Sequence, residues 1–119
     1  MNEKSILENG EYVMPPGVTL WGNILGFLFE KWGQKFQIEP CEIDIIIDNS
    51  NKSLSEFGIN GEIVFTPGHS HGSITVVHDS GDAFVGDMAM NGLPVTIKPN
   101  LPIFAENIPT LKDSWKKLY

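Results

Sequence analysis

Hydrophobic side chains recur at helical spacing between Val18 and Gly33 and predict an amphipathic helix there. Thr19 is placed to cap its first turn, and Gly33 to end it. The apolar positions form two adjacent stripes, with Leu20, Ile24, Phe27 and Leu28 in one and Trp21, Leu25, Phe29 and Trp32 in the other. Because this face is wider than a single sheet contact requires, we expect the helix either to be deeply buried or to lie at an interface or against a substrate pocket.

Short apolar segments bounded by turn residues predict strands in the rest of the chain. They are Lys35 to Ile38, Glu42 to Ile47, Glu62 to Thr66, Ser73 to His78 and Ala83 to Val85. The last two are expected to form a hairpin across Asp79-Ser80-Gly81-Asp82, in which Asp79 and Asp82 serve only the turn. Cys41 shares one strand face with Ile43, Ile45 and Ile47, so it is expected to be a small core residue rather than a thiolate metal ligand.

The two ends of the chain differ in pattern. Residues Met1 to Gly17 are polar, with a turn signal at Asn9-Gly10, and Met88 to Leu101 read as a loop. A closing helix is predicted to start near Pro109, with Ile108, Leu111, Trp115 and Leu118 on its apolar stripe. A run of strands between two helices predicts a single α+β domain over residues 1–119, built on a mostly antiparallel sheet with at least two helices.

Composition narrows the functional classes. The formal net charge is −7, and the 8 basic residues form no cluster larger than Lys116-Lys117. This balance disfavours binding to nucleic acid or to an anionic membrane. The single Cys41 rules out an intramolecular disulfide, and the N-terminus leads into no apolar signal core. A cytoplasmic location is therefore expected.

The candidate chemistry lies at two strand ends. The strand that ends at Phe65 leads into Thr66-Pro67-Gly68-His69-Ser70-His71-Gly72-Ser73, and a later one leads into Phe84-Val85-Gly86-Asp87. A neutral imidazole from His69 and a carboxylate from Asp87 are ligands that a borderline-soft divalent ion such as zinc accepts. Ser73 has no base spaced to serve it, so Ser/His/Asp catalysis is not supported.

These two motifs, in this order around an Asp-Ser-Gly-Asp turn, resemble the second half of the metallo-β-lactamase fold superfamily, over roughly Glu42 to Tyr119. The resemblance implies that His69 binds one metal and that Asp87 bridges two, as in the hydrolases similar to glyoxalase II. True β-lactamases generally carry Cys at the second position, so Asp87 points away from antibiotic hydrolysis. The metal implied is zinc, with iron or manganese as the alternatives that the sequence does not separate.

The superfamily's main ligand run, His-x-His-x-Asp-His, has no counterpart, since the only histidines are His69, His71 and His78. The resemblance therefore implies the C-terminal half of an αββα sandwich, trimmed slightly at its end, that lacks a complete dinuclear site. One such half would leave a sheet face uncovered, so we expect a homo-oligomer or a complementing N-terminal half as its partner.

The remaining histidines have simpler interpretations. His71 is either an exposed loop residue or a candidate accessory ligand or proton shuttle, and the exposed loop residue is the favoured interpretation. His78 adjoins the hairpin turn and is expected to be solvent-exposed. Trp21 and Trp32 are expected to be core or interface residues rather than a substrate platform.

Two functions remain open from the sequence. One is a fragment of a metal-dependent hydrolase acting on an ester, thioester, lactone or phosphoester, with no catalytic residue complete in the isolated chain. In that reading the helix of Val18 to Trp32 and the loop of Met88 to Leu101 contribute to the pocket wall. The other is a non-catalytic half-domain that pairs with itself or with a partner chain. The substrate is not readable, because specificity lies in loops and pockets rather than in the metal motif.

Overall fold

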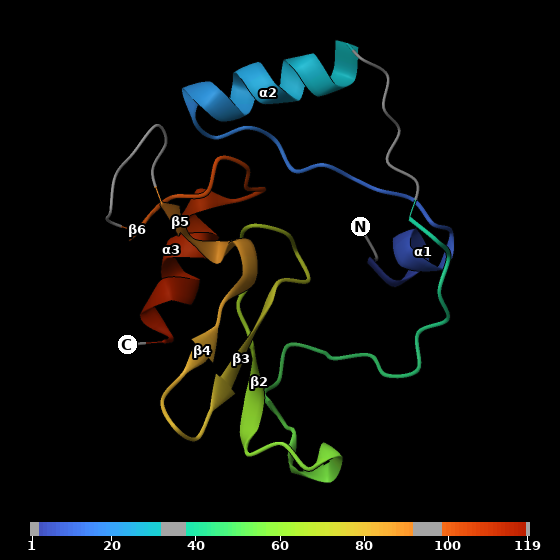
Figure 1. Cartoon of the computed structure of the whole chain (residues 1–119), viewed down its shortest axis with the longest axis vertical. Coiled ribbons are helices and arrows are strands. Elements are labelled where there is room, and N and C mark those ends of the chain that lie inside the picture. Colours follow the sequence, from blue (N-terminus) through green and yellow to red (C-terminus); the bar gives the residue numbers. More distant parts are fainter. Residues whose placement is uncertain (1–2, 32–37, 92–98, 119) are drawn as a thin grey trace.

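A four-stranded antiparallel sheet is the main element of the computed structural model, which describes residues 3–31, 38–91 and 99–118 (Figure 1). Its strands lie in the order β1 (Lys52–Ser53), β2 (Gly61–Phe65), β3 (Ile74–His78) and β4 (Ala83–Phe84). The helices are α1 (Glu3–Glu8), α2 (Leu20–Lys31) and α3 (Ile108–Lys116), with short 3-10 turns η1 (Ser55–Phe57) and η2 (Gly86–Met88). A two-stranded sheet pairs β5 (Met90–Asn91) with β6 (Pro99–Asn100). The α+β class is thus confirmed.

The central hairpin follows the sequence pattern closely. All five residues of β2 pair with β3, from Gly61 opposite His78 to Phe65 opposite Ile74. β3 then returns into β4 through a turn in which the His78 amide donates to the Asp82 carbonyl at 2.8 Å. The predicted hairpin across residues 79–82 is therefore confirmed. Gly81, with φ +93°, supplies the left-handed position that the turn needs.

Helix α3 carries the buried core. Leu111 is fully buried and packs with Met88 and Ala105, and the surrounding contacts come from Val18, Val85, Leu101, Ile108, Trp115 and Leu118. The side chain of Asn107 caps α3 by accepting a hydrogen bond from the Thr110 amide at 2.9 Å. The predicted closing helix and its apolar stripe are confirmed, and this stripe joins the end of the sheet to the later loops.

The Thr-Pro-Gly turn lies directly against α3. A side chain at Gly68 would begin 2.4 Å from the backbone nitrogen and Cα of Leu111, and Gly68 itself has φ +137°. The carbonyl of Pro67 accepts a hydrogen bond from the Ser114 hydroxyl at 2.7 Å, and the carbonyl of Gly68 accepts one from the Asn107 amide at 2.9 Å. Only glycine has the missing Cβ and the backbone freedom that this approach requires.

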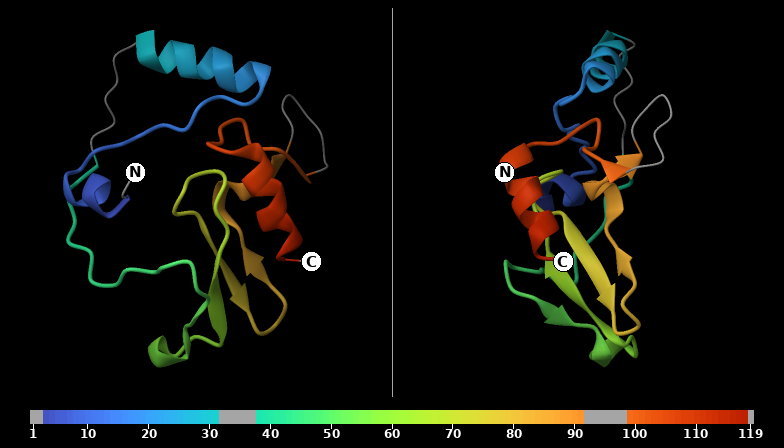
Figure 2. Two further views of the ribbon diagram at one scale, coloured as in Figure 1. Left: turned by 180° about the vertical axis from the view of Figure 1, so that it is seen from behind. Right: turned by 90° about the vertical axis from the view of Figure 1, so that its left-hand side faces the viewer.

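Helix α2 begins where the sequence predicts but is not buried. Thr19 caps it, since its hydroxyl accepts a hydrogen bond from the Gly22 amide at 3.0 Å. Of the two alternatives for this helix, deep burial is excluded, because Leu20 is 75 % exposed and Phe27 is 63 % exposed; a position at an interface or against a pocket stays a prediction. Figure 2 shows α2 standing apart from the sheet in both views. The proposed helix end at Gly33 and the second-stripe residue Trp32 lie outside the described residues.

The segment before the sheet does not form the strand predicted there. Residues 42–47 form no strand, since no neighbouring chain offers a ladder of hydrogen-bonding groups to them among the described residues. Cys41 is exposed, so its assignment to the core is wrong for the same reason: the strand face it was to share does not exist. The strand predicted at Lys35 to Ile38 falls mostly on residues outside the description. The short helix α1, in a stretch read only as polar, was not predicted.

The chain is broad and thin. Its principal extents are 45 × 37 × 21 Å and its radius of gyration is 15.7 Å, against about 13.5 Å for a compact domain of this length. Within the described ranges, no helix combines the length and the apolar character needed to cross a bilayer. The flat shape leaves several large apolar side chains, those of α2 foremost, without a covering layer.

We expect Gly68→Ala to lower the free energy of unfolding by at least about 3 kcal/mol, through positive φ and a clash with the Leu111 backbone. The matched control is Gly81→Ala, which has φ +93° but open space around the added methyl group and should cost only about 1–2 kcal/mol. Urea unfolding at one fixed protein concentration measures both. Equal losses for the two variants would contradict the importance of the close approach.

Candidate metal centre

His69 is held in one orientation by the segment that precedes α3. Its ring Nδ1 lies 2.8 Å from the carbonyl oxygen of Phe104, and its own carbonyl accepts a hydrogen bond from the Glu106 amide at 3.0 Å. A carbonyl oxygen only accepts, so Nδ1 carries the proton and Nε2 of the neutral ring keeps its lone pair. Metal-binding histidines are oriented in this way, with the second ring nitrogen donating to a backbone carbonyl or a carboxylate.

The base of the His69 loop is closed by polar contacts that are buried or partly buried. The hydroxyls of Thr66 and Thr75 lie 2.9 Å apart with both residues fully buried. The Thr66 amide donates to the Ser73 carbonyl at 3.0 Å, and the Ser73 hydroxyl accepts from the Ser70 amide at 3.0 Å. These contacts hold the loop at both ends of the turn, so the position of the His69 ring is set by the backbone around it.

Asp87 lies in η2, directly after β4. Gly86 has φ +57°, which turns the chain sharply before Asp87. The next residue, Met88, is 2 % exposed, and its carbonyl accepts a hydrogen bond from the Trp115 indole nitrogen at 3.1 Å. Helix α3 therefore holds the Asp87 turn through Trp115, just as it holds the His69 loop through Leu111 and Ser114.

These two turns bring the predicted pair together. His69 Nε2 and Asp87 Oδ2 are 3.8 Å apart, and the two side chains are 21 % and 79 % exposed. Two ligand atoms that each lie about 2.1 Å from a tetrahedral zinc ion are about 3.4 Å apart. The observed separation is close to that value, and the exposed carboxylate has room to adjust. The pair fits two positions of a divalent metal's coordination shell.

The described residues do not form the rest of such a shell. Among residues 3–31, 38–91 and 99–118, no group of three or more His, Cys, Asp or Glu side chains is arranged to hold a metal ion. Structural and catalytic zinc sites use four and three protein ligands respectively. His69 and Asp87 by themselves would supply only two ligands of such a site.

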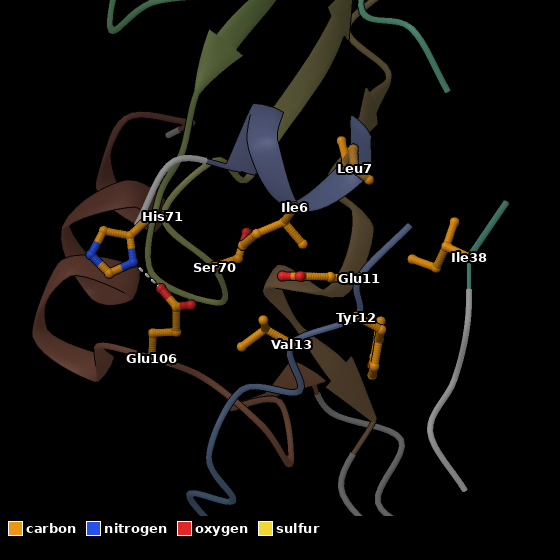
Figure 3. Close-up of a pocket in the computed structure, with 9 residues that line it drawn as sticks. All are labelled: Ile6, Leu7, Glu11, Tyr12, Val13, Ile38, Ser70, His71 and Glu106. Atoms are coloured by element: carbon orange, nitrogen blue, oxygen red, sulfur yellow. Dashed lines mark hydrogen bonds and ion pairs between the residues drawn. The ribbon is translucent and has the colours of Figure 1, made fainter. Parts of the chain in front are cut away.

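His71 is placed away from this pair and interacts with another acid. Its Nδ1 lies in hydrogen-bonding contact with Glu106 Oε2, and its side chain is 72 % exposed (Figure 3). His78 lies partly exposed at the hairpin turn, where its Nδ1 is 2.8 Å from the Ser80 hydroxyl. The Ser80 hydroxyl donates to Asp82 Oδ2 at 2.7 Å, so Asp82 serves the turn as predicted.

Three residues that shape the centre were not predicted from the sequence. Phe104 acts through its carbonyl, which carries no side-chain signal in a sequence. Glu106 and Asn107 act as the partner of His71 and as the cap of α3. An Asn two residues before Pro109 is a helix-start signal that was available to find Asn107.

Comparisons of the chain with protein-family models, with curated proteins and with solved structures found no match.

Proposed function

We propose that this chain is the C-terminal half of a metal-dependent hydrolase of the metallo-β-lactamase superfamily, in which His69 and Asp87 are metal ligands. The metal is zinc, with iron or manganese as the alternatives. The proposal includes the fold that the resemblance implies, one half of an αββα sandwich. The isolated half is inactive, and a partner chain or an N-terminal half supplies the missing ligands.

The observation that carries this proposal is the arrangement of His69, with Nδ1 donating to Phe104 and Nε2 facing Asp87 at 3.8 Å. Metal-binding histidines are oriented by the same kind of contact, in which one ring nitrogen donates to a backbone carbonyl and leaves the other for the metal. The two motifs lie 18 residues apart at His69 and Asp87, and they meet only because α3 holds both turns. This combination supports a metal pair more strongly than either residue does separately.

A metal bound here supplies Lewis acidity, which makes water a nucleophile at neutral pH. The contribution of this chain is positional. The Phe104 carbonyl keeps the His69 lone pair directed at the site, and Gly86 with Met88 keeps Asp87 beside it. Because neither residue supplies a general acid, substrate binding and proton transfer fall to groups outside the described pair.

We expect the chain to bind zinc weakly, with a dissociation constant in the micromolar range or higher. His69→Ala and Asp87→Ala should each raise this dissociation constant at least about tenfold. His78→Ala is the matched histidine control and should leave the affinity unchanged, because His78 serves the hairpin turn. Competition with a chromophoric chelator measures all four proteins. Tight one-to-one zinc that survives dialysis and is insensitive to both ligand variants would contradict the assignment.

We expect the isolated chain to show no hydrolase turnover above that of free zinc, because two ligands do not hold a metal firmly enough to direct water. A p-nitrophenyl ester and a bis-p-nitrophenyl phosphodiester are suitable substrates. The result that opposes this expectation is robust turnover that a chelator abolishes and that His69→Ala removes.

A second function, that of a non-catalytic pairing module, is favoured by the uncovered face of α2. Leu20, Ile24 and Phe27 lie on successive turns of one face, and all three are exposed. Burying a large apolar side chain completely is worth about 1.5–3 kcal/mol. We propose that a second copy of the chain covers this face by a twofold pairing, which both candidate functions allow.

We expect light scattering behind size exclusion to give about twice the chain mass of 13.2 kDa, or more, at micromolar concentration. Phe27→Asp should shift the protein toward the monomer, because it places a charge in the proposed interface between the two copies. Asn23→Asp adds the same charge at an exposed polar position of α2 and should not. A sharp monomer peak with cooperative unfolding for the unaltered chain would count against the pairing.

A further inference from the structure

A hollow of about 230 Å³ lies between the N-terminal segment and the His69 loop, on the side where His71 meets Glu106 (Figure 3). Its wall is mainly apolar and comes from α1, from the residues after it and from Ile38. The lining side chains are Ile6, Leu7, Glu11, Tyr12, Val13, Ile38, Ser70, His71 and Glu106. The hollow is separate from the proposed metal pair, since neither His69 nor Asp87 lines it.

Two carboxylates face this apolar wall from opposite sides. Figure 3 shows Glu11 reaching in from the segment after α1, with its carboxylate directed toward the side of Ser70 and Glu106. Glu106 enters from the other side, with Oε2 on His71 Nδ1 and its second oxygen turned toward the hollow. No lysine or arginine is among the lining residues, and the chain as a whole carries a net charge of −7. The charge of the hollow therefore complements a cation.

We propose that this hollow binds a small organic ammonium ion, with the charged nitrogen between Glu11 and Glu106 and the apolar body against Ile6 and Val13. The two carboxylates accept charge-assisted hydrogen bonds from the ammonium group, which are the stronger kind. The contact with His71 holds the Glu106 carboxylate in place. The apolar wall favours a ligand with a carbon skeleton, because that skeleton buries apolar surface against it and a bare inorganic cation does not.

The volume limits the size of the ligand. A cavity of about 150 Å³ accommodates benzene, so a hollow of 230 Å³ accommodates an aryl ring with a two-carbon amine. Drug-sized ligands occupy pockets of about 300–1,000 Å³, which is larger than this one. The proposal therefore concerns a small molecule, and it holds whether or not the chain binds a metal.

The test uses the full chain in the presence of a chelator, with three probes of one skeleton: 2-phenylethylamine, 2-phenylethanol and 3-phenylpropanoate. Titrations followed by amide NMR shifts measure each affinity. We expect saturable binding of the amine, with shifts at Val13 and Ser70, at least about tenfold tighter than that of the alcohol or the acid. Glu11→Gln should weaken amine binding about fivefold or more, while Glu30→Gln on α2 is the matched control and should leave it unchanged.

Three results would overturn the proposal: no saturable binding of the amine, equal or tighter binding of the alcohol or the acid, or an amine affinity that Glu11→Gln does not alter. Because zinc is absent and neither His69 nor Asp87 is altered, these results are independent of the metal-binding experiment. A spectrum with unchanged dispersion shows that Glu11→Gln remains folded, so a loss of binding reports on the hollow itself.

Discussion

The close approach between Gly68 and the backbone of Leu111 sets the geometry on which the candidate site depends. It lets the turn after β2 lie flat against α3, where backbone groups of the turn bond to Asn107 and Ser114. The same helix holds the second turn through the indole of Trp115 and the carbonyl of Met88. One nine-residue helix thereby fixes two loops that come from different strands, and a metal pair requires this kind of rigid support.

The two histidines of the first motif are both oriented by the segment just before α3, but toward different ends. His69 donates to the carbonyl of Phe104, which frees its outer nitrogen toward Asp87. His71 contacts the carboxylate of Glu106, which belongs to the hollow on the other side of the loop. Phe104 thus offers a backbone acceptor to His69, and Glu106 offers a side-chain acceptor to His71. These two contacts direct the histidines toward two different proposed sites, the metal pair and the amine site.

The small core leaves apolar side chains uncovered in the outer parts of the molecule. The core around Leu111 is confined to α3, η2 and the segments beside them. Helix α2 is attached near its start, where the amide of Val18 donates to the carbonyl of Ile103 at 2.9 Å, and its broad apolar face is left exposed. Exposed apolar patches of this kind mark interaction surfaces in soluble proteins. The proposed half-sandwich and the proposed pairing module both predict a partner that covers this face.

Local pattern was sufficient for the elements that depend on near neighbours. The hairpin across residues 79–82, the Thr19 cap of α2 and the apolar stripe of α3 all follow from spacing and turn chemistry. The metal role of His69 and Asp87 stays a prediction. Pattern failed for residues 42–47 and Cys41, because a strand exists only where another strand completes its hydrogen bonds. The pattern also did not show whether the apolar face of α2 is covered. An apolar stripe predicts that another element should cover it, but it does not show that this element is present in the same chain. The 3.8 Å separation of His69 from Asp87, the orienting carbonyl of Phe104 and the placement of Glu11 and Glu106 around one hollow were decided only by tertiary structure. Each brings together segments that are far apart in the sequence, so their distance is set by the packing of the chain rather than by their own residues.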